Sequence, residues 1–285
     1  MLEIIVSSIA VIALIIGSIT DIKTREVPDW LNFSLIPLAL GIRLIASLAS
    51  NDYSFIISGL IGFVSFFLLA LFMFYTGQWG GGDSKMLMGI GALVGLEFNL
   101  NTTLISFLVN VVIVGSLYGL FWSMILVFQN RNKFFKEFKK MINSIKLLQR
   151  IILTIFLILI AGSLLIDSIV LKMLVISFLV VLYFSFYLIL FVKIVEKSCM
   201  LKYVNPTEVT EGDWIVKDIY IGKEFISGPK DLGIEKKQLN KLIAYYKKGK
   251  IKKVLIKIGI PFVPSFLIAY IMTLMLGNLL LYLII

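Results

Sequence analysis

The sequence predicts an all-α polytopic membrane protein that carries one small α+β cytosolic domain. Apolar residues make up 59% and charged residues 15% of the 285 residues, whereas soluble domains hold about 45–50% and about 25%. A soluble globule of this composition would expose apolar patches that monomers rarely carry. The apolar residues also occur in long runs, and only residues 194–260 have the composition of a soluble domain.

Eight apolar runs predict membrane spans, because a helix needs about 20 apolar residues to cross the hydrocarbon. The runs are 2–19, 31–49, 54–76, 84–98, 102–128, 151–167, 172–193 and 261–285. The first run has no basic segment before it and is followed by charged residues. We therefore expect a retained helix there, not a cleaved signal peptide.

The basic residues predict the orientation of these spans. If residues 20–30 lie in the cytoplasm, 25 of the 27 Lys and Arg residues fall on that side, and only Arg43 and Lys172 do not. This asymmetry is typical of membrane proteins. The loops expected outside, near 50–53, 98–101 and 167–171, contain no Lys or Arg. Orientation and contact with anionic lipid explain the net charge of +10, so we expect a lipid bilayer and no nucleic acid as partner.

Two segments are not predicted to span the membrane. Residues 131–150 place bulky apolar residues at helical spacing among Lys and Arg, which predicts an interfacial helix, with a partner-docking helix as the alternative. In the second segment, 214–221 and 254–258 alternate like strands, and 234–248 has helical spacing. The predicted parts are a membrane core (1–128), an interfacial helix with a transmembrane hairpin (129–193), a cytosolic domain (194–260) and a final transmembrane helix (261–285).

The composition excludes several kinds of catalysis. The chain has no histidine and a single cysteine, Cys199. It therefore lacks a histidine-assisted nucleophile, a zinc-protease histidine pair, a cysteine-rich zinc site and an intrachain disulfide. We expect no metal and no cofactor, and any chemistry must come from carboxylates, lysines, hydroxyls or backbone groups.

Two aspartates are the candidate catalytic residues, because carboxylates in or beside membrane helices indicate function. Asp21 follows the first span, and Asp83 follows Gly80-Gly81-Gly82, where glycines permit close backbone approach. The run after Asp83 covers only about 22 Å of a core about 30 Å thick. Asp83 is therefore expected below the surface, in a loop that lines a cavity. A helix-end carboxylate for Asp21 and an N-cap for Asp83 are the structural alternatives.

Two spans separate Asp21 from Asp83, so both are expected on the same face of the membrane. A carboxylate pair can share one proton, so that one member activates water and the other protonates the leaving amine. This chemistry predicts an aspartic endopeptidase. The main alternative is a proton- or cation-coupled transporter that uses the same aspartates, although the two halves show no inverted repeat. A scaffold protein and a Ser/Lys peptidase also stay open.

The glycine loop resembles that of the GxGD membrane aspartic proteases, and within them the archaeal preflagellin and type IV prepilin peptidases. The resemblance rests on Gly80-Gly81-Gly82-Asp83-Ser84-Lys85-Met86 with Gly89, Gly91 and Gly95, and on Asp21 followed by Pro28-Asp29. Residues 205–206, 211–214 and 261–266 resemble the carboxyl-terminal part of the archaeal branch. The resemblance covers 1–128 and 196–285 and implies a six-helix core, into which 131–193 would be inserted as a helical hairpin.

The resemblance implies an enzyme of the cell membrane that removes a short basic leader from archaellin or type IV pilin-like precursors on the cytoplasmic side. Asp21 and Asp83 would be catalytic, within a motif that includes Gly80, Gly82 and Lys85. Lys85 would favour the ionised form of Asp83 or reach lipid phosphate. An acidic pocket on a basic face would attract the leader, with Glu26 and Asp29 as contacts. Pro261 and Pro264 would kink the last helix and shape the substrate groove, or simply start that helix.

Overall fold

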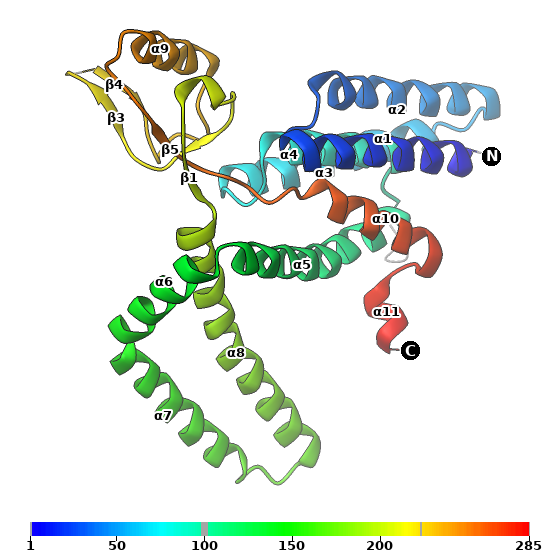
Figure 1. Ribbon diagram of the computed structural model, residues 1–285. Helices are drawn as coiled ribbons and strands as arrows, with labels where there is room; N and C mark the ends of the chain where they lie inside the picture. The colour runs from blue at the N-terminus through cyan, green and yellow to red at the C-terminus, as the bar shows by residue number, and fades with distance from the viewer. Residues whose placement is uncertain (1, 98–101, 223, 285) are drawn as a thin grey trace. The chain divides into compact units, whose positions relative to one another are not determined.

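The computed structural model describes residues 2–97, 102–222 and 224–284 and is predominantly helical (Figure 1). The predicted loop near 98–101 lies outside the described residues. The helices are α1 (Leu2–Thr24), α2 (Asp29–Ser50), α3 (Ser54–Tyr75), α4 (Gly81–Val94), α5 (Thr103–Gln129), α6 (Arg131–Ser144), α7 (Lys146–Ser163), α8 (Ile169–Cys199), α9 (Lys236–Lys247), α10 (Val263–Leu276) and α11 (Leu279–Ile284). The strands are β1 (Leu201–Val204), β2 (Trp214–Ile215), β3 (Ile219–Ile221), β4 (Glu224–Ser227) and β5 (Val254–Lys257), and a 3-10 helix, η1, covers Pro206–Glu208.

Within the described ranges, six helices are long and apolar enough to cross a membrane: α1, α2, α3, α5, α7 and α8. The predicted class, a polytopic membrane protein with a small sheet region, is confirmed. The other two predicted spans are shorter, since α4 and α10 have 14 residues each. Gly95 and Gly277, both with positive φ, follow these helices and end them. The segment 261–285 is therefore two helices, α10 and α11, and a full crossing there stays a prediction.

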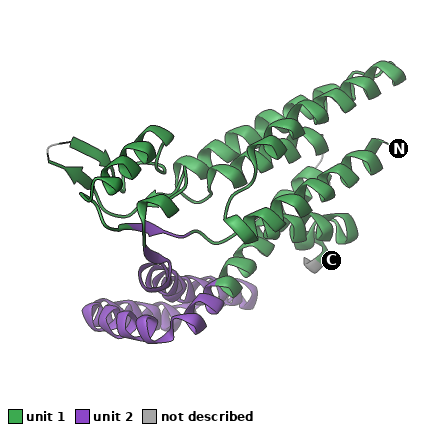
Figure 2. Ribbon diagram, turned by 45° about the horizontal axis from the view of Figure 1, so that its top comes forward, with its two compact units in different colours: residues 1–122, 204–254, 259–285 green, residues 123–203, 255–258 purple. Residues whose placement is uncertain are grey.

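The chain forms two compact units (Figure 2). The first contains 1–122, 204–254 and 259–285, and the second contains 123–203 and 255–258. Both candidate aspartates belong to the first unit. The predicted cytosolic domain, 194–260, is divided between the two units, so its independence as a domain stays a prediction.

The first unit is built around α4, which packs against α1, α2 and α3. Its side chains Met86, Leu87 and Ile90 are fully buried. Glycines bring α3 and α4 into backbone contact, because a Cβ added to Gly91 would lie 2.7 Å from the carbonyl oxygen of Gly62. A helix too short to span the membrane alone is thereby enclosed by longer ones.

Replacing Gly62 with alanine should destabilise the protein. The added methyl group would collide with the backbone of Gly91 and Gly95, and overpacking typically costs about 1–3 kcal/mol. Gly119→Ala is the matched control, because this helical glycine has no atom within 4 Å of the added Cβ. We expect thermal unfolding in detergent to occur several degrees lower for Gly62→Ala and not for Gly119→Ala. Equal unfolding temperatures for the two variants would contradict the α3–α4 packing.

The second unit contains the predicted insertion. Phe134 of α6 is buried with Ile194 and Val195 of α8, and Glu137 forms an ion pair with Lys197 at 3.3 Å. Helix α7 also packs against α8, which gives the predicted hairpin. The interfacial helix expected over 131–150 is shorter than predicted: α6 ends at Ser144 and the following residues begin α7.

The strands near the end of the chain are shorter than the alternation predicted. The single strand expected over 214–221 is β2 and β3, separated by a bend at Lys217. Strands β3 and β4 form an antiparallel pair with Ile221 opposite Glu224. Strands β1 and β5 are neighbours in the other sheet. The helix predicted over 234–248 is α9, and Gln238 caps its first turn by accepting a hydrogen bond from the Glu235 amide at 2.8 Å.

Candidate active site

Asp21 lies in the last turn of α1 and is almost completely buried, with 6% of its surface exposed. Its Oδ2 atom accepts a hydrogen bond from the backbone N–H of Val263, the first residue of α10, at 3.0 Å. The N–H groups in the first turn of a helix have no partner within the helix and attract negative charge. The carboxylate is therefore oriented by α10, far away in the sequence.

Asp83 is the third residue of α4, and its Oδ2 atom accepts a hydrogen bond from the Gly80 amide at 3.1 Å. The structural alternative, Asp83 as the N-cap, is therefore replaced by Gly80 as the N-cap, and the bond from its amide holds the Asp83 side chain in one orientation. The glycine before it allows close packing, because a Cβ on Gly82 would lie 3.3 Å from atoms of Val27. The start of α4 can therefore approach the loop that follows α1.

The structure brings the two aspartates into one neighbourhood. Helices α1 and α4 are in contact, and a Cβ on Gly17 would lie 2.7 Å from the Met86 methyl group. Val27 lies beside both Gly17 and Gly82. The charges of Asp21 and Asp83 are close enough to interact. The predicted carboxylate pair therefore has a structural basis in the packing of α1 on α4.

Aromatic side chains connect the helices that carry this pair. The ring of Trp79, next to the glycine loop, lies 6.0 Å from Phe262 and 5.3 Å from Phe266 at the start of α10. The ring of Phe262 also packs closely on Gly115 of α5, since a Cβ added to Gly115 would lie 2.8 Å from this ring. This cluster fixes the start of α4 relative to the start of α10, and so fixes Asp83 relative to the group that orients Asp21.

Comparison with known proteins identifies a family model and three relatives that are similar to this chain. Residues 8–124 match the model of the type IV leader peptidase family, and this range includes Asp21 and Asp83. The chain is also similar to three preflagellin peptidases, and the predicted resemblance to this family is confirmed.

The three relatives come from methanogenic archaea. The preflagellin peptidase of Methanocaldococcus jannaschii is 40% identical over 86 residues, which is 30% of this chain and 36% of the relative. That of Methanococcus maripaludis is 35% identical over 146 residues, 46% of this chain and 63% of the relative. That of Methanococcus voltae is 39% identical over 89 residues, which is 30% of this chain and 37% of the relative. The matched part thus spans between about a third and two thirds of each relative.

Within the leader peptidase segment, Lys85 does not bond to Asp83. Its ammonium group forms an ion pair with Asp29 at 2.7 Å and lies 4.9 Å from the ring of Phe33. Asp29 thus has a cationic partner already. Pro264 lies in the first turn of α10, where proline is compatible with a helix start, and Pro261 is buried in the segment before it.

Glu26 is exposed, and its charge interacts with that of Asp213, which sequence reasoning did not single out. The pKa of the Asp213 carboxyl is raised, mainly by burial and further by the charge of Glu26. The hydrogen bond from the N–H of Thr210 opposes this increase. The neighbouring Trp214 ring lies against the loop before α4, 2.6 Å from where a Cβ on Gly77 would be. The segment 211–214 therefore lies beside the loop that leads into α4. Its resemblance to the archaeal branch was the sequence feature that could have identified it as part of the site.

Arg25 was also missed. It has a positive φ of 61°, and its guanidinium donates a hydrogen bond to the carbonyl of Gly259 at 3.1 Å. It also lies 5.2 Å from the ring centre of Trp122, and its charge interacts with that of Asp21. Arg25 thus ties the end of α1 to the segment that leads into α10. Its place four residues after Asp21 was visible in the sequence, but its partners were not.

Two buried polar side chains near the ends of α1 and α2 lack partners within the described residues. They are the Ser18 hydroxyl and the Asn32 amide, and Ser18 lies one turn before Asp21. Single polar residues in apolar spans were a usable signal. The described residues contain no group of three or more metal-ligating acidic, Cys or His side chains.

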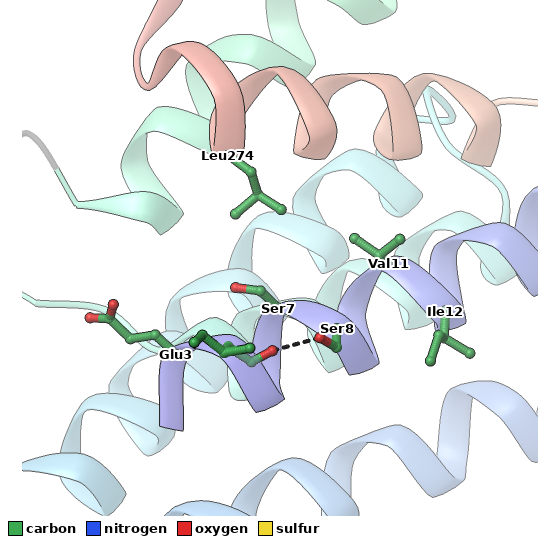
Figure 3. Close-up of a pocket in the computed structure, with 7 residues that line it drawn as sticks. Glu3, Ser7, Ser8, Val11, Ile12 and Leu274 are labelled. Carbon is green, nitrogen blue, oxygen red and sulfur yellow. Dashed lines mark hydrogen bonds between the residues drawn. The ribbon is translucent and has the colours of Figure 1, made fainter. Parts of the chain in front are cut away.

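A surface cavity lies at the other end of α1 from Asp21 (Figure 3). The sides are formed by α1 residues from Glu3 to Ile12 and by Leu274 of α10. The hydroxyl of Ser8 donates to the carbonyl of Ile4 at 2.7 Å, so this polar group is satisfied within the helix. The cavity expected around the glycine loop stays a prediction.

Proposed function

We propose that the protein is a membrane aspartic endopeptidase, which removes the short basic leader from archaellin or type IV pilin-like precursors at the cytoplasmic membrane face. The observation that supports this proposal is that Asp21 and Asp83 both lie within residues 8–124, the segment that matches the leader peptidase family, on helices α1 and α4, which pack together. The three relatives are preflagellin peptidases, which supports the substrate class.

The chemistry follows from two carboxylates that share one proton. The ionised carboxylate takes a proton from a water molecule, and the water oxygen attacks the carbonyl carbon of the scissile bond. The protonated carboxyl group donates a hydrogen bond to the carbonyl oxygen and later gives its proton to the leaving nitrogen. The N–H of Val263 and the N–H of Gly80 hold the two carboxylates in place throughout.

The leader would bind through its positive charge. Glu26 and Asp213 lie close enough for their charges to interact, so a Lys or Arg side chain between them would relieve their repulsion. Asp29 is a weaker candidate than the sequence suggested, because Lys85 already neutralises it. A local acidic site on a basic cytoplasmic face would attract the positively charged leader. It would not attract neutral or acidic amino termini.

The test is cleavage of a purified archaellin-like precursor by membranes that contain the full chain. We expect a shortened product with a new amino terminus, identified by mass spectrometry, and no product with membranes lacking the protein. A precursor with its leader Lys and Arg residues changed to Gln should be cleaved more slowly. Absence of cleavage of both archaellin-like and pilin-like precursors, together with proton flux in proteoliposomes, would instead support the transporter alternative.

A further inference from the structure

Tyr118 of α5 carries a buried hydroxyl group that has no hydrogen-bond partner among the residues described. Buried polar groups in proteins are nearly always hydrogen-bonded, because leaving one unpaired is costly. An unpaired group of this kind requires an explanation, and a catalytic role is one of those known.

The ring of Tyr118 is held rigidly. It stacks on Trp122, one turn further along α5, at a centroid distance of 5.9 Å. Trp122 in turn lies under the guanidinium of Arg25, which is anchored to the carbonyl of Gly259. The side chain is therefore positioned by contacts with α5, with the end of α1 and with the segment before α10.

The hydroxyl of Tyr118 is close enough to Asp21 and to Arg25 to interact electrostatically with both, in line with the contact between Arg25 and the neighbouring Trp122. The Asp21 carboxylate accepts a hydrogen bond from Val263, and the Tyr118 hydroxyl has no partner among the described residues. The O–H group thus remains available near Asp21.

We propose that Tyr118 is a third catalytic group, whose hydroxyl donates a hydrogen bond to the scissile carbonyl oxygen as that oxygen becomes negatively charged. This inference rests on the proposed function. When water adds to the carbonyl carbon, the C=O electron pair moves to oxygen, and the O–H of Tyr118 stabilises the charge without giving up its proton. The pair returns to re-form C=O as the C–N bond breaks, and the nitrogen takes its proton from the carboxyl group.

Preorganised donors of this kind act strongly because they are already oriented and shielded from water. The positive charge of Arg25, whose guanidinium lies over the neighbouring Trp122, adds a field that favours an oxyanion at the same place. Both groups come from outside the GxGD motif, so the motif alone would describe the site incompletely.

The test compares the full-length parent with Tyr118→Phe, which removes one oxygen atom and leaves the ring. We expect kcat for precursor cleavage to fall about 10²-fold, as on loss of one oxyanion donor, with KM changed less than about twofold. The matched control is Tyr183→Phe, whose hydroxyl has a partner in Tyr187 at 3.2 Å and whose ring stacks on Phe156. This control should keep the parent kcat.

Thermal unfolding supplies a second readout. Because the Tyr118 hydroxyl has no partner within the described chain, Tyr118→Phe should unfold at the same temperature as the parent or a higher one. A lower unfolding temperature would show that the hydroxyl has a structural partner and would overturn the proposal. A parent-like kcat, or a raised KM with unchanged kcat, would also overturn it. In that case loss of cleavage in the aspartate variants would still leave the proposed function standing, whereas an inactive parent would contradict that function itself.

Discussion

Asp21→Asn and Asp83→Asn should each reduce the rate of leader removal by about 10³-fold or more. The amide cannot take a proton from water or give one to the leaving amine, so either substitution removes one half of the acid–base cycle. The two carboxylates act as a unit, so the loss of either one removes most of the rate enhancement that both provide. The double variant should therefore be hardly slower than either single variant. Both amides can still accept the hydrogen bonds from Val263 and Gly80, so folding should be preserved.

The measurement is the initial rate of precursor cleavage at matched protein levels in membranes. Asp52→Asn is the matched control: this carboxylate is exposed in the loop between α2 and α3 and accepts a bond from the Ser54 amide at 2.9 Å. Its substitution should leave the rate within about twofold, since surface changes away from special features have small effects. Undiminished cleavage in either Asp21→Asn or Asp83→Asn would exclude the carboxylate-pair mechanism.

Arg43→Leu should strongly destabilise the fold. Arg43 is 5% exposed, although it lies within the predicted span α2. Its guanidinium donates to the carbonyls of Leu93 at 3.0 Å and of Val94, the last residues of α4. It also donates to the Phe55 carbonyl at 2.9 Å and to the Ser58 hydroxyl at 2.8 Å. One side chain thus caps α4 and ties it to α2 and α3.

Leucine would fill part of the space but leave the carbonyls of Leu93 and Val94 without this donor, whereas the Phe55 carbonyl still accepts from the Ser58 hydroxyl. Each unpaired group costs about 1–3 kcal/mol, so we expect a total loss of about 3–5 kcal/mol, similar to that on breaking a buried ionic contact. Thermal unfolding in detergent should show a large decrease, and Arg43→Lys an intermediate one, since an ammonium group cannot reproduce the fork geometry. The exposed Arg150 supplies the control, and Arg150→Leu should change stability by less than about 0.5 kcal/mol. Equal effects at the two positions would contradict the capping role.

The positions of most helices were predictable because hydrophobic run length is a local property. The six long helices follow the predicted runs, and α9 follows its helical spacing. Two boundaries failed for a shared reason. Alternation suggested one strand over 214–221, and apolar composition suggested one helix over 261–285, but a bend at Lys217 and the backbone conformation of Gly277 interrupt them. Periodicity measures which face is apolar and is insensitive to a local break.

The site was predictable where the chemistry lies in the motif and unpredictable where it depends on packing. Sequence reasoning selected Asp21 and Asp83, since each is a carboxylate beside an apolar span. It placed Lys85 beside Asp83 or at lipid phosphate, whereas the structure pairs Lys85 with Asp29 of α2. It had no means to select Tyr118, which looks like any aromatic residue in an apolar helix until its hydroxyl is found buried without a partner in the described chain.

The sequence by itself determined the class of the protein, the approximate spans and the two carboxylates that we propose as catalytic. These follow from composition, run length and the conformational freedom of three consecutive glycines, all of which are local. Only the tertiary structure decided that α10 orients Asp21, that Arg43 caps α4 and that Tyr118 lies near Asp21. Each of these is a contact between segments far apart in the chain. Such contacts depend on how the helices pack. The order of residues within one helix does not show which backbone group of another helix its side chains will contact.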